Sequence, residues 1–283
     1  MIDAIINYEF LQNAFFSGLL IGIIAPLLGV FIVVRRMSLI ADALSHVTLA
    51  GIAGSLYLSQ TFTVLALINP IYLGIVASVS GSILIERLRT LYKHYEELAI
   101  PIIMSGGIGL SAIFISLASG FNTDIMSYLF GSVSAVSRQD LWVVIAITIV
   151  VFLFLYTFFK EMFVLSFDEE FAKASGLPAK TIHLLFMVVV ALVIAASMRI
   201  VGILLVSSLI TLPVAASMRI AKGFKQTILF SILFGEAAVI LGLVSAFYLN
   251  LAPGGTIVVT SILILLIVIL GKKAAMKMKA ERV

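Results

Sequence analysis

The chain contains a long apolar run near its beginning that constrains every later inference. From Ala14 to Val34 no charged residue occurs over 21 positions. At about 1.5 Å of rise per residue, a helix of this length covers the ~30 Å hydrocarbon core of a lipid bilayer. The run therefore predicts a transmembrane helix, and it is the first of several.

Eight further apolar runs follow, separated by short polar connections. They lie at about residues 38–58, 62–86, 98–119, 140–160, 181–198, 200–218, 226–249 and 255–271. We expect an all-α, polytopic membrane protein of about nine transmembrane helices, forming one domain over residues 1–283. The stretch 120–139 is short and rich in Gly and Ser, which favours a re-entrant or external helix and leaves a total of eight to ten open.

The composition agrees with a membrane protein. Hydrophobic residues make up 62% of the chain and charged residues only 11%, whereas soluble domains are about 25% charged. The absence of cysteine excludes disulfides, thiolate metal sites and cysteine nucleophiles. The net charge of +4 comes from Lys and Arg residues scattered among short loops, which indicates a positive-inside membrane protein and no nucleic-acid partner.

The basic residues also predict the orientation. Asp3 and Glu9 precede the first run and a pair of arginines follows it, so we expect the N-terminus outside and, after nine spans, the C-terminus in the cytoplasm. Most basic clusters then face the cytoplasm: Arg35 and Arg36; Arg87, Arg89 and Lys93; Lys160, Lys173 and Lys180; Arg219, Lys222 and Lys225; and Lys272 through Arg282. Only Arg138 and Arg199 fall on the outside.

Asp42 and His46 are ionisable residues within an apolar run, where a charge costs at least ~2.5–3.5 kcal/mol at the bilayer centre. Their i, i+4 spacing places both side chains on one face of a helix. A carboxylate and an imidazole suit a divalent ion such as Zn²⁺, Mn²⁺ or Fe²⁺. The same pair could instead satisfy itself by a hydrogen bond or serve in a proton relay. Ser45 lies about 100° round the helix and is not expected to be a ligand.

Glu236 is the third ionisable residue within an apolar run and lies near mid-membrane if its helix is continuous. It is a second candidate for the ion path, and a protonated carboxyl bonded to a neighbouring helix is the alternative. His183 begins a span beside Lys180, and we assign it no special role.

Residues 160–180 form the longest polar connection. Asp168, Glu169 and Glu170 precede a short amphipathic pattern that ends at Gly176, as expected for a helix with acids in its first turn and a glycine stop. Such a helix is either a docking site for a soluble partner or an ordinary loop helix.

Five segments of the chain resemble one known family. They read RRMSLIADALSHVTLAG, SYLFGSVSAVS, LSFDEEFAKASGL, VGILLVSSLITLPVAA and APGGTIVV. They resemble the permease subunit of bacterial ABC importers for zinc, manganese and iron, and YEFLQNAF, DALSHVTLAG and LNLAPGGTIVV favour the zinc branch.

The resemblance implies a homodimer in the bacterial cell membrane, two cytoplasmic ATPase subunits, and an extracellular or periplasmic metal-binding protein that delivers the ion. The metal is cargo, and no permanent cofactor is expected. Asp42 and His46 would contact the ion. The residues implied in ATPase docking are Phe167, Asp168, Glu169, Glu170 and Gly176, and those along or near the dimer pathway are Ser207, Ser208 and Pro213.

The chain itself shows no motif for catalysis. It lacks GxxxxGK[ST] and HExxH, so we expect no enzyme activity and a separate ATPase subunit. A secondary metal transporter or channel coupled to protons, using Asp42, His46 and Glu236, remains the alternative.

Overall fold

The protein is all-α. The computed structural model describes residues 7–62, 67–92, 94–118 and 123–280, and within these ranges it contains helices and no β-strand. The long helices are α2 (Glu9–Val34), α3 (Leu39–Thr61), α4 (Pro70–Leu91), α5 (Ala99–Leu117), α7 (Arg138–Phe167), α9 (Ala179–Val201), α10 (Ile203–Ile220), α11 (Phe224–Leu249) and α12 (Pro253–Ala280). Shorter elements are η2 (Glu96–Leu98), α6 (Thr123–Phe130) and α8 (Glu169–Ala174).

Nine helices of the described ranges are long and apolar enough to cross a membrane, which confirms the predicted fold class. Each predicted run falls largely within one of them. The main shift is at α4, which begins at Pro70 rather than near residue 62, because the Asn69 side chain accepts a hydrogen bond from the backbone N–H of Ile71 (3.1 Å) and proline suits the first helical position. Lys93, Arg282 and the predicted positions at 63–66 and 119–122 lie outside the described residues.

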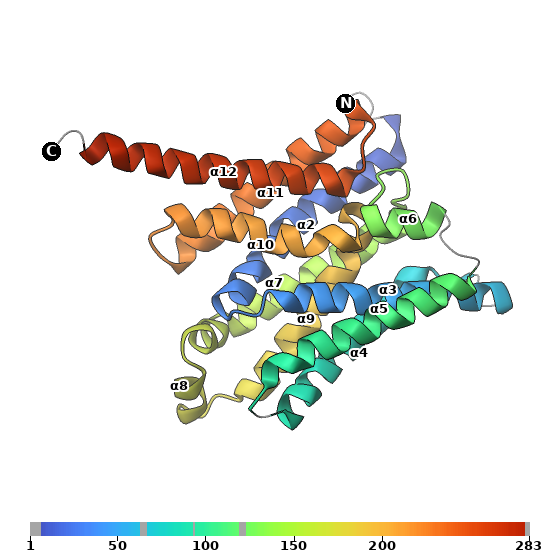
Figure 1. Cartoon of the computed structure of the whole chain (residues 1–283), viewed down its shortest axis with the longest axis horizontal. Helices are drawn as coiled ribbons and strands as arrows, with labels where there is room; N and C mark the ends of the chain where they lie inside the picture. The colour runs from blue at the N-terminus through green and yellow to red at the C-terminus, as the bar shows by residue number, and fades with distance from the viewer. Residues whose placement is uncertain (1–6, 63–66, 93, 119–122, 281–283) are drawn as a thin grey trace.

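The ambiguous stretch 120–139 contains α6, which at eight residues is too short to span a bilayer. It packs against α9, α10 and α12 (Figure 1). After a loop, α7 begins at a capping box in which Ser137 and Asp140 bond each other's backbone N–H groups.

Helix α2 lies at the centre of the bundle and packs against α7, α9, α10 and α11 (Figure 1), while α3 packs against both α4 and α5. Glycines allow the closest of these contacts. A Cβ atom on Gly18 would lie 3.0 Å from Leu243 of α11, and one on Gly29 would lie 2.1 Å from the carbonyl oxygen of Ile210 in α10. Small residues let the backbones of neighbouring helices approach closely, which is how helices pack in lipid.

Two glycines with positive φ fasten the loop after α6 to the break between α9 and α10. Gly131 (φ 77°) and Gly202 (φ 84°) adopt a conformation that side chains disfavour. A Cβ on Gly131 would lie 2.1 Å from the Ile200 carbonyl oxygen, and the N–H of Ser132 donates to the carbonyl of Arg199 (3.0 Å). The chain therefore needs glycine at both crossing points.

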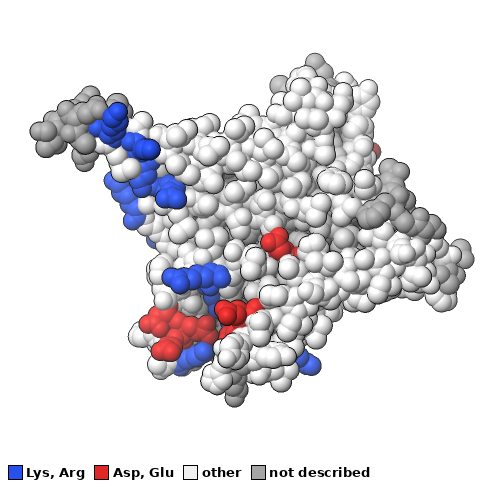
Figure 2. All heavy atoms as spheres, in the orientation of Figure 1, with Lys and Arg blue, Asp and Glu red and all other residues white. Residues whose placement is uncertain are grey.

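The charged residues gather at one end of the bundle. Figure 2 shows them along the side where α8 and the end of α12 lie, with most of the remaining visible face uncharged. We call this end, where α2, α4 and α7 finish and α3, α5 and α9 begin, the charged end.

Candidate functional site

Asp42 and His46 both lie on α3, close to the charged end. Asp42 is in the first turn and His46 is one turn further, and both are half-buried. The neighbouring Ser45 is buried and donates its hydroxyl to the carbonyl of Ala41 (2.8 Å). The Ser45 hydroxyl is therefore bonded within the helix, whereas the side chains of Asp42 and His46 lie on a face of α3 that is partly open.

Close contact with α5 fixes the backbone at His46. A Cβ atom on Gly107 of α5 would lie 2.8 Å from the Val47 nitrogen and 2.9 Å from the His46 carbonyl carbon. From α4, a Cβ on Gly81 would lie 2.9 Å from the Val47 side chain. Neighbouring helices thus hold the first two turns of α3 at a defined position.

The pair does not form a complete metal site within one chain. Among the described residues, no three His, Cys, Asp or Glu side chains come together in a way that could hold a metal ion. Two protein ligands leave at least two positions of a four-coordinate ion for water or for other groups.

Glu236 is not brought to this pair. It lies on α11, and its Oε1 atom would be 2.6 Å from a Cβ on Gly22 of α2. That oxygen is buried and has no hydrogen-bond partner among the described residues. A buried carboxylate oxygen without a partner is costly, and the part of Glu236 in the ion path stays a prediction.

The predicted pathway residues lie on α10, which also contacts α3. Ser207 and Ser208 are half-buried, whereas Pro213 is buried inside a helix that continues through it. The part of these residues in a pathway stays a prediction.

The polar connection 160–180 contains the predicted short helix, α8. Asp168 caps it by accepting a hydrogen bond from the N–H of Phe171 (2.8 Å), and Gly176 (φ 79°) follows its end. Phe167 and Phe171 are 62% and 60% exposed, and the acidic residues of the first turn are exposed as well. The end of α7 and the start of α8 therefore present two aromatic rings beside carboxylates at the charged end.

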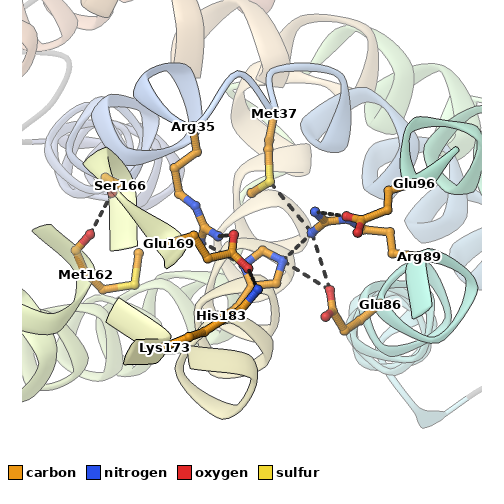
Figure 3. A network of polar contacts seen from close by, with 10 residues as sticks. All are labelled: Arg35, Met37, Glu86, Arg89, Glu96, Met162, Ser166, Glu169, Lys173 and His183. Atoms are coloured by element: carbon orange, nitrogen blue, oxygen red, sulfur yellow. Dashed lines mark hydrogen bonds and ion pairs between the residues drawn. The ribbon is translucent and has the colours of Figure 1, made fainter. Parts of the chain in front are cut away.

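A polar network lies beneath α8 (Figure 3). We call it the Arg35 network; it comprises Arg35, Glu86, Arg89, Glu96, Glu169, Lys173 and His183. These residues come from the ends of α2 and α4, from η2 and α8, and from the start of α9. When His183 is neutral, the three positive charges of the network equal its three negative charges, so the network carries no net charge.

His183 is at the centre of the Arg35 network and is 5% exposed. Its Nδ1 lies 2.8 Å from Arg35, and its Nε2 lies 3.1 Å from Glu86 and 2.7 Å from Arg89. Guanidinium groups only donate, and a neutral imidazole has a single acceptor nitrogen, so it cannot accept from both arginines. The imidazole can therefore accept a hydrogen bond from one arginine only. The Glu86 carboxylate, 3.1 Å from Nε2 and 3.5 Å from Arg89, supplies negative charge on the Arg89 side of the ring.

Glu169 connects α8 to this network. It lies 3.6 Å from Arg35, whose side chain is only 5% exposed, and 2.8 Å from Lys173 one turn further along α8. Partial burial raises the pKa of Glu169, but the hydrogen bond and charge of Lys173 and the charge of Arg35 outweigh it, so the pKa lies below its ordinary value. The carboxylate is therefore ionised at neutral pH.

The sequence matches the ABC 3 transport family over residues 7–272. The chain belongs to this family. A "Probable metal transport system membrane protein" of Treponema pallidum (strain Nichols) is 37% identical over 93% of this chain and 96% of its own length. The "Manganese import system permease protein ScaB" of Streptococcus gordonii is 36% identical over 94% of this chain and 92% of its own.

A solved structure has the same fold. The structure titled "PsaBC from Streptococcus pneumoniae in complex with Fab" superposes with a TM-score of 0.81 at 34% identity, covering 94% of this chain and 93% of that one. As a member of the ABC 3 transport family, the chain is a multi-pass permease component of a metal importer and not a catalytic enzyme. Because the chain belongs to this family, the alternative that the sequence left open, a proton-coupled secondary transporter or channel, is not favoured.

Sequence reasoning missed most of the Arg35 network in this ABC 3 transport family member. His183, treated as an interfacial residue without a role, is a buried hub. Glu86 and His183 each lie one turn from a span end, and charges at span ends are common enough to carry little signal. The buried pair of Asp140 and Arg199 at the opposite end was missed for the same reason.

Proposed function

We propose that this chain is the permease of an importer in the bacterial cell membrane that moves a divalent transition metal, driven by a separate ATPase subunit. Asp42 and His46 contact the ion as it passes. The observation that carries the proposal is the half-buried acid–imidazole pair on α3, in a chain of a metal-transport permease family. An incomplete ligand set suits transport, because a conducted ion must leave as well as enter.

Mn²⁺ is the metal to test first. The zinc preference expected from sequence has no support among the reported relatives, and the Streptococcus gordonii relative is named a manganese import permease. A carboxylate with an imidazole accepts either metal, so the residues alone do not choose.

The remaining ligands and partners follow from the same arrangement. A second copy of the chain, meeting the first along the partly open faces of α3 and α10, would bring another Asp42 and His46 to a shared pathway.

The charged end faces the cytoplasm by the positive-inside rule, with the N-terminus outside. The ATPase docks there on the exposed surface of Phe167, Asp168, Glu170 and Phe171, and Gly176 ends the docking segment. A metal-binding protein delivers the ion on the other side.

The test of the pathway is metal uptake by cells or proteoliposomes that contain the complete transporter. Asp42→Ala and His46→Ala should each abolish Mn²⁺ uptake while the complex still assembles. His94→Ala is the control, because His94 is an exposed histidine in a connection outside the spans. Normal uptake in either pathway variant would remove the pair from the path, and uptake of Zn²⁺ in preference to Mn²⁺ would reverse the choice of metal.

Docking is tested separately by co-purification. Replacing Asp168 and Glu170 together by Lys reverses two exposed charges on α8 and should reduce recovery of the ATPase with the permease. Unchanged recovery would show that this surface is simply solvated.

A further inference from the structure

Glu169 and Glu170 are adjacent on α8 but have different surroundings. Glu169 reaches the bundle and pairs with Arg35, whereas Glu170 is exposed and forms no ion pair among the described residues. Helix α8 otherwise packs against its chain neighbours α7 and α9. The ion pair between Arg35 and Glu169 joins α8 to the end of α2. Among the hydrogen bonds and ion pairs of the described residues, no other one joins α8 to a helix besides α7 and α9.

This link crosses a cavity rather than a packed interface. A cavity of about 470 Å³ lies between the two parts, and its lining includes Arg36, Met37, Glu97, Ile100 and Phe167. The direct contact from α8 to the turn between α2 and α3 is therefore polar, whereas close packing connects α8 to α2 through α7 and α9.

Arg35 lies in a turn that is itself tightly bonded. The N–H of Arg36 donates to Val33 (3.0 Å), that of Met37 to Ile32 (2.9 Å), and that of Ile40 to Met37 (3.0 Å). Met37 and Ile40 are buried. Since the turn has little freedom, a displacement of Arg35 passes to the first turn of α3 rather than being absorbed.

The first turn of α3 carries Asp42, and the second carries His46. On the other side of Arg35, its guanidinium lies 2.8 Å from Nδ1 of His183, whose Nε2 lies 3.1 Å from Glu86 (Figure 3). Arg35 is thus held by two partners, one fixed in the bundle and one on α8.

We propose that Arg35 is a positioning residue that links the movement of α8 to the Asp42–His46 pair, with Glu169 as its partner on α8. The inference rests on the proposed function, and it separates two roles on one short helix. Glu169 faces inward and transmits, whereas Glu170 and Phe171 face outward and dock.

The test measures coupling, defined as Mn²⁺ taken up per ATP hydrolysed, in proteoliposomes containing the permease, its ATPase and the metal-binding protein. Glu169→Gln and Arg35→Gln should leave the ATPase bound and active but lower the ratio by about 5- to 150-fold, the usual range for coupling between sites. The double variant should be no worse than the more severe single one, because both changes remove the same contact. Glu161→Gln, a carboxylate of α7 that forms no ion pair among the described residues, is the control.

A ratio equal to that of the wild type in Glu169→Gln overturns the proposal, as does a parallel fall of uptake and hydrolysis. Glu169 is half-exposed, so its replacement does not threaten folding, and it decides the question if the buried Arg35 variant fails to assemble. Failure of the proposed function looks different, because the wild-type complex itself would then show no ATP-dependent Mn²⁺ uptake.

Discussion

The ion pair of Asp140 and Arg199, at the end of the bundle away from the charged end, gives a quantitative test of the fold. Asp140→Asn preserves size but removes the charge from a side chain that is 4% exposed and that pairs directly with Arg199. It also weakens the acceptor for Asn69 (3.2 Å) and for the Ser137 hydroxyl (2.6 Å). The half-buried Arg199 would keep its charge without a counter-ion.

Removing one partner of a buried pair costs about 3–5 kcal/mol. Arg199 is 19% exposed and lies 5.3 Å from the centre of the Tyr128 ring, and both features lessen the cost. We therefore expect the lower value, about 3 kcal/mol. At about 2–4 °C per kcal/mol for a chain of this size, the melting temperature should fall by about 6 °C or more.

Thermal unfolding of the purified permease in one detergent, at one scan rate, measures this shift. Arg138→Gln is the matched control, because Arg138 and Glu9 are 73% and 67% exposed at a separation of 4.0 Å, and such a pair contributes about 0–1 kcal/mol. A shift in Asp140→Asn no larger than that in Arg138→Gln would refute the argument that burial of the pair stabilises this end. The double variant Asp140→Asn/Arg199→Met should recover stability relative to Asp140→Asn, since no unpaired charge remains.

Three other predictions follow from single residues. Gly107→Ala should reduce Mn²⁺ uptake and lower the melting temperature, because the added Cβ would lie 2.8 Å from a backbone nitrogen of α3; Gly106→Ala, where a Cβ meets nothing within 4 Å, should have no effect. Glu236→Gln should lower uptake severalfold without loss of assembly, and wild-type kinetics would return Glu236 to a packing role. The pKa of Glu169 is lowered in the folded protein, so the stabilisation from its ion pair is fully present above the ordinary pKa of 4.5 and is lost as the pH falls through the lower folded pKa. The ratio of wild-type to Glu169→Gln coupling should therefore be constant from about pH 6 to 8.

Hydropathy alone predicted the membrane helices, because a helix in lipid satisfies its own backbone and needs only length and apolar side chains. The predicted run 226–249 and the observed α11 (Phe224–Leu249) differ by two residues at one end. The start of α4 was missed by more, because Asn69 and Pro70 define a helix start by local bonding that a hydropathy average ignores.

The Arg35 network could not be predicted in this way. Arg35 and His183 are 148 residues apart and Arg89 and His183 are 94 apart, so no local spacing relates them. Each residue alone reads as an ordinary charge at a span end. Asp42 and His46 could be paired from sequence because both lie on one helix about one turn apart, where sequence spacing is also spatial spacing; their role at the ion stays a prediction.

The two ends of the bundle are built differently, and the difference favours movement at one of them. Away from the charged end, the Asp140–Arg199 pair is largely buried, and backbone contacts at Gly131 and Gly202 leave no room for even a Cβ atom. At the charged end, the Arg35–Glu169 pair is long at 3.6 Å, half-exposed on one side, and bordered by a cavity. A force applied to α8 would therefore displace the first turns of α3 while the opposite end holds its helices together. Variants of Asp140 should accordingly change stability, whereas variants of Glu169 should change coupling at nearly constant stability.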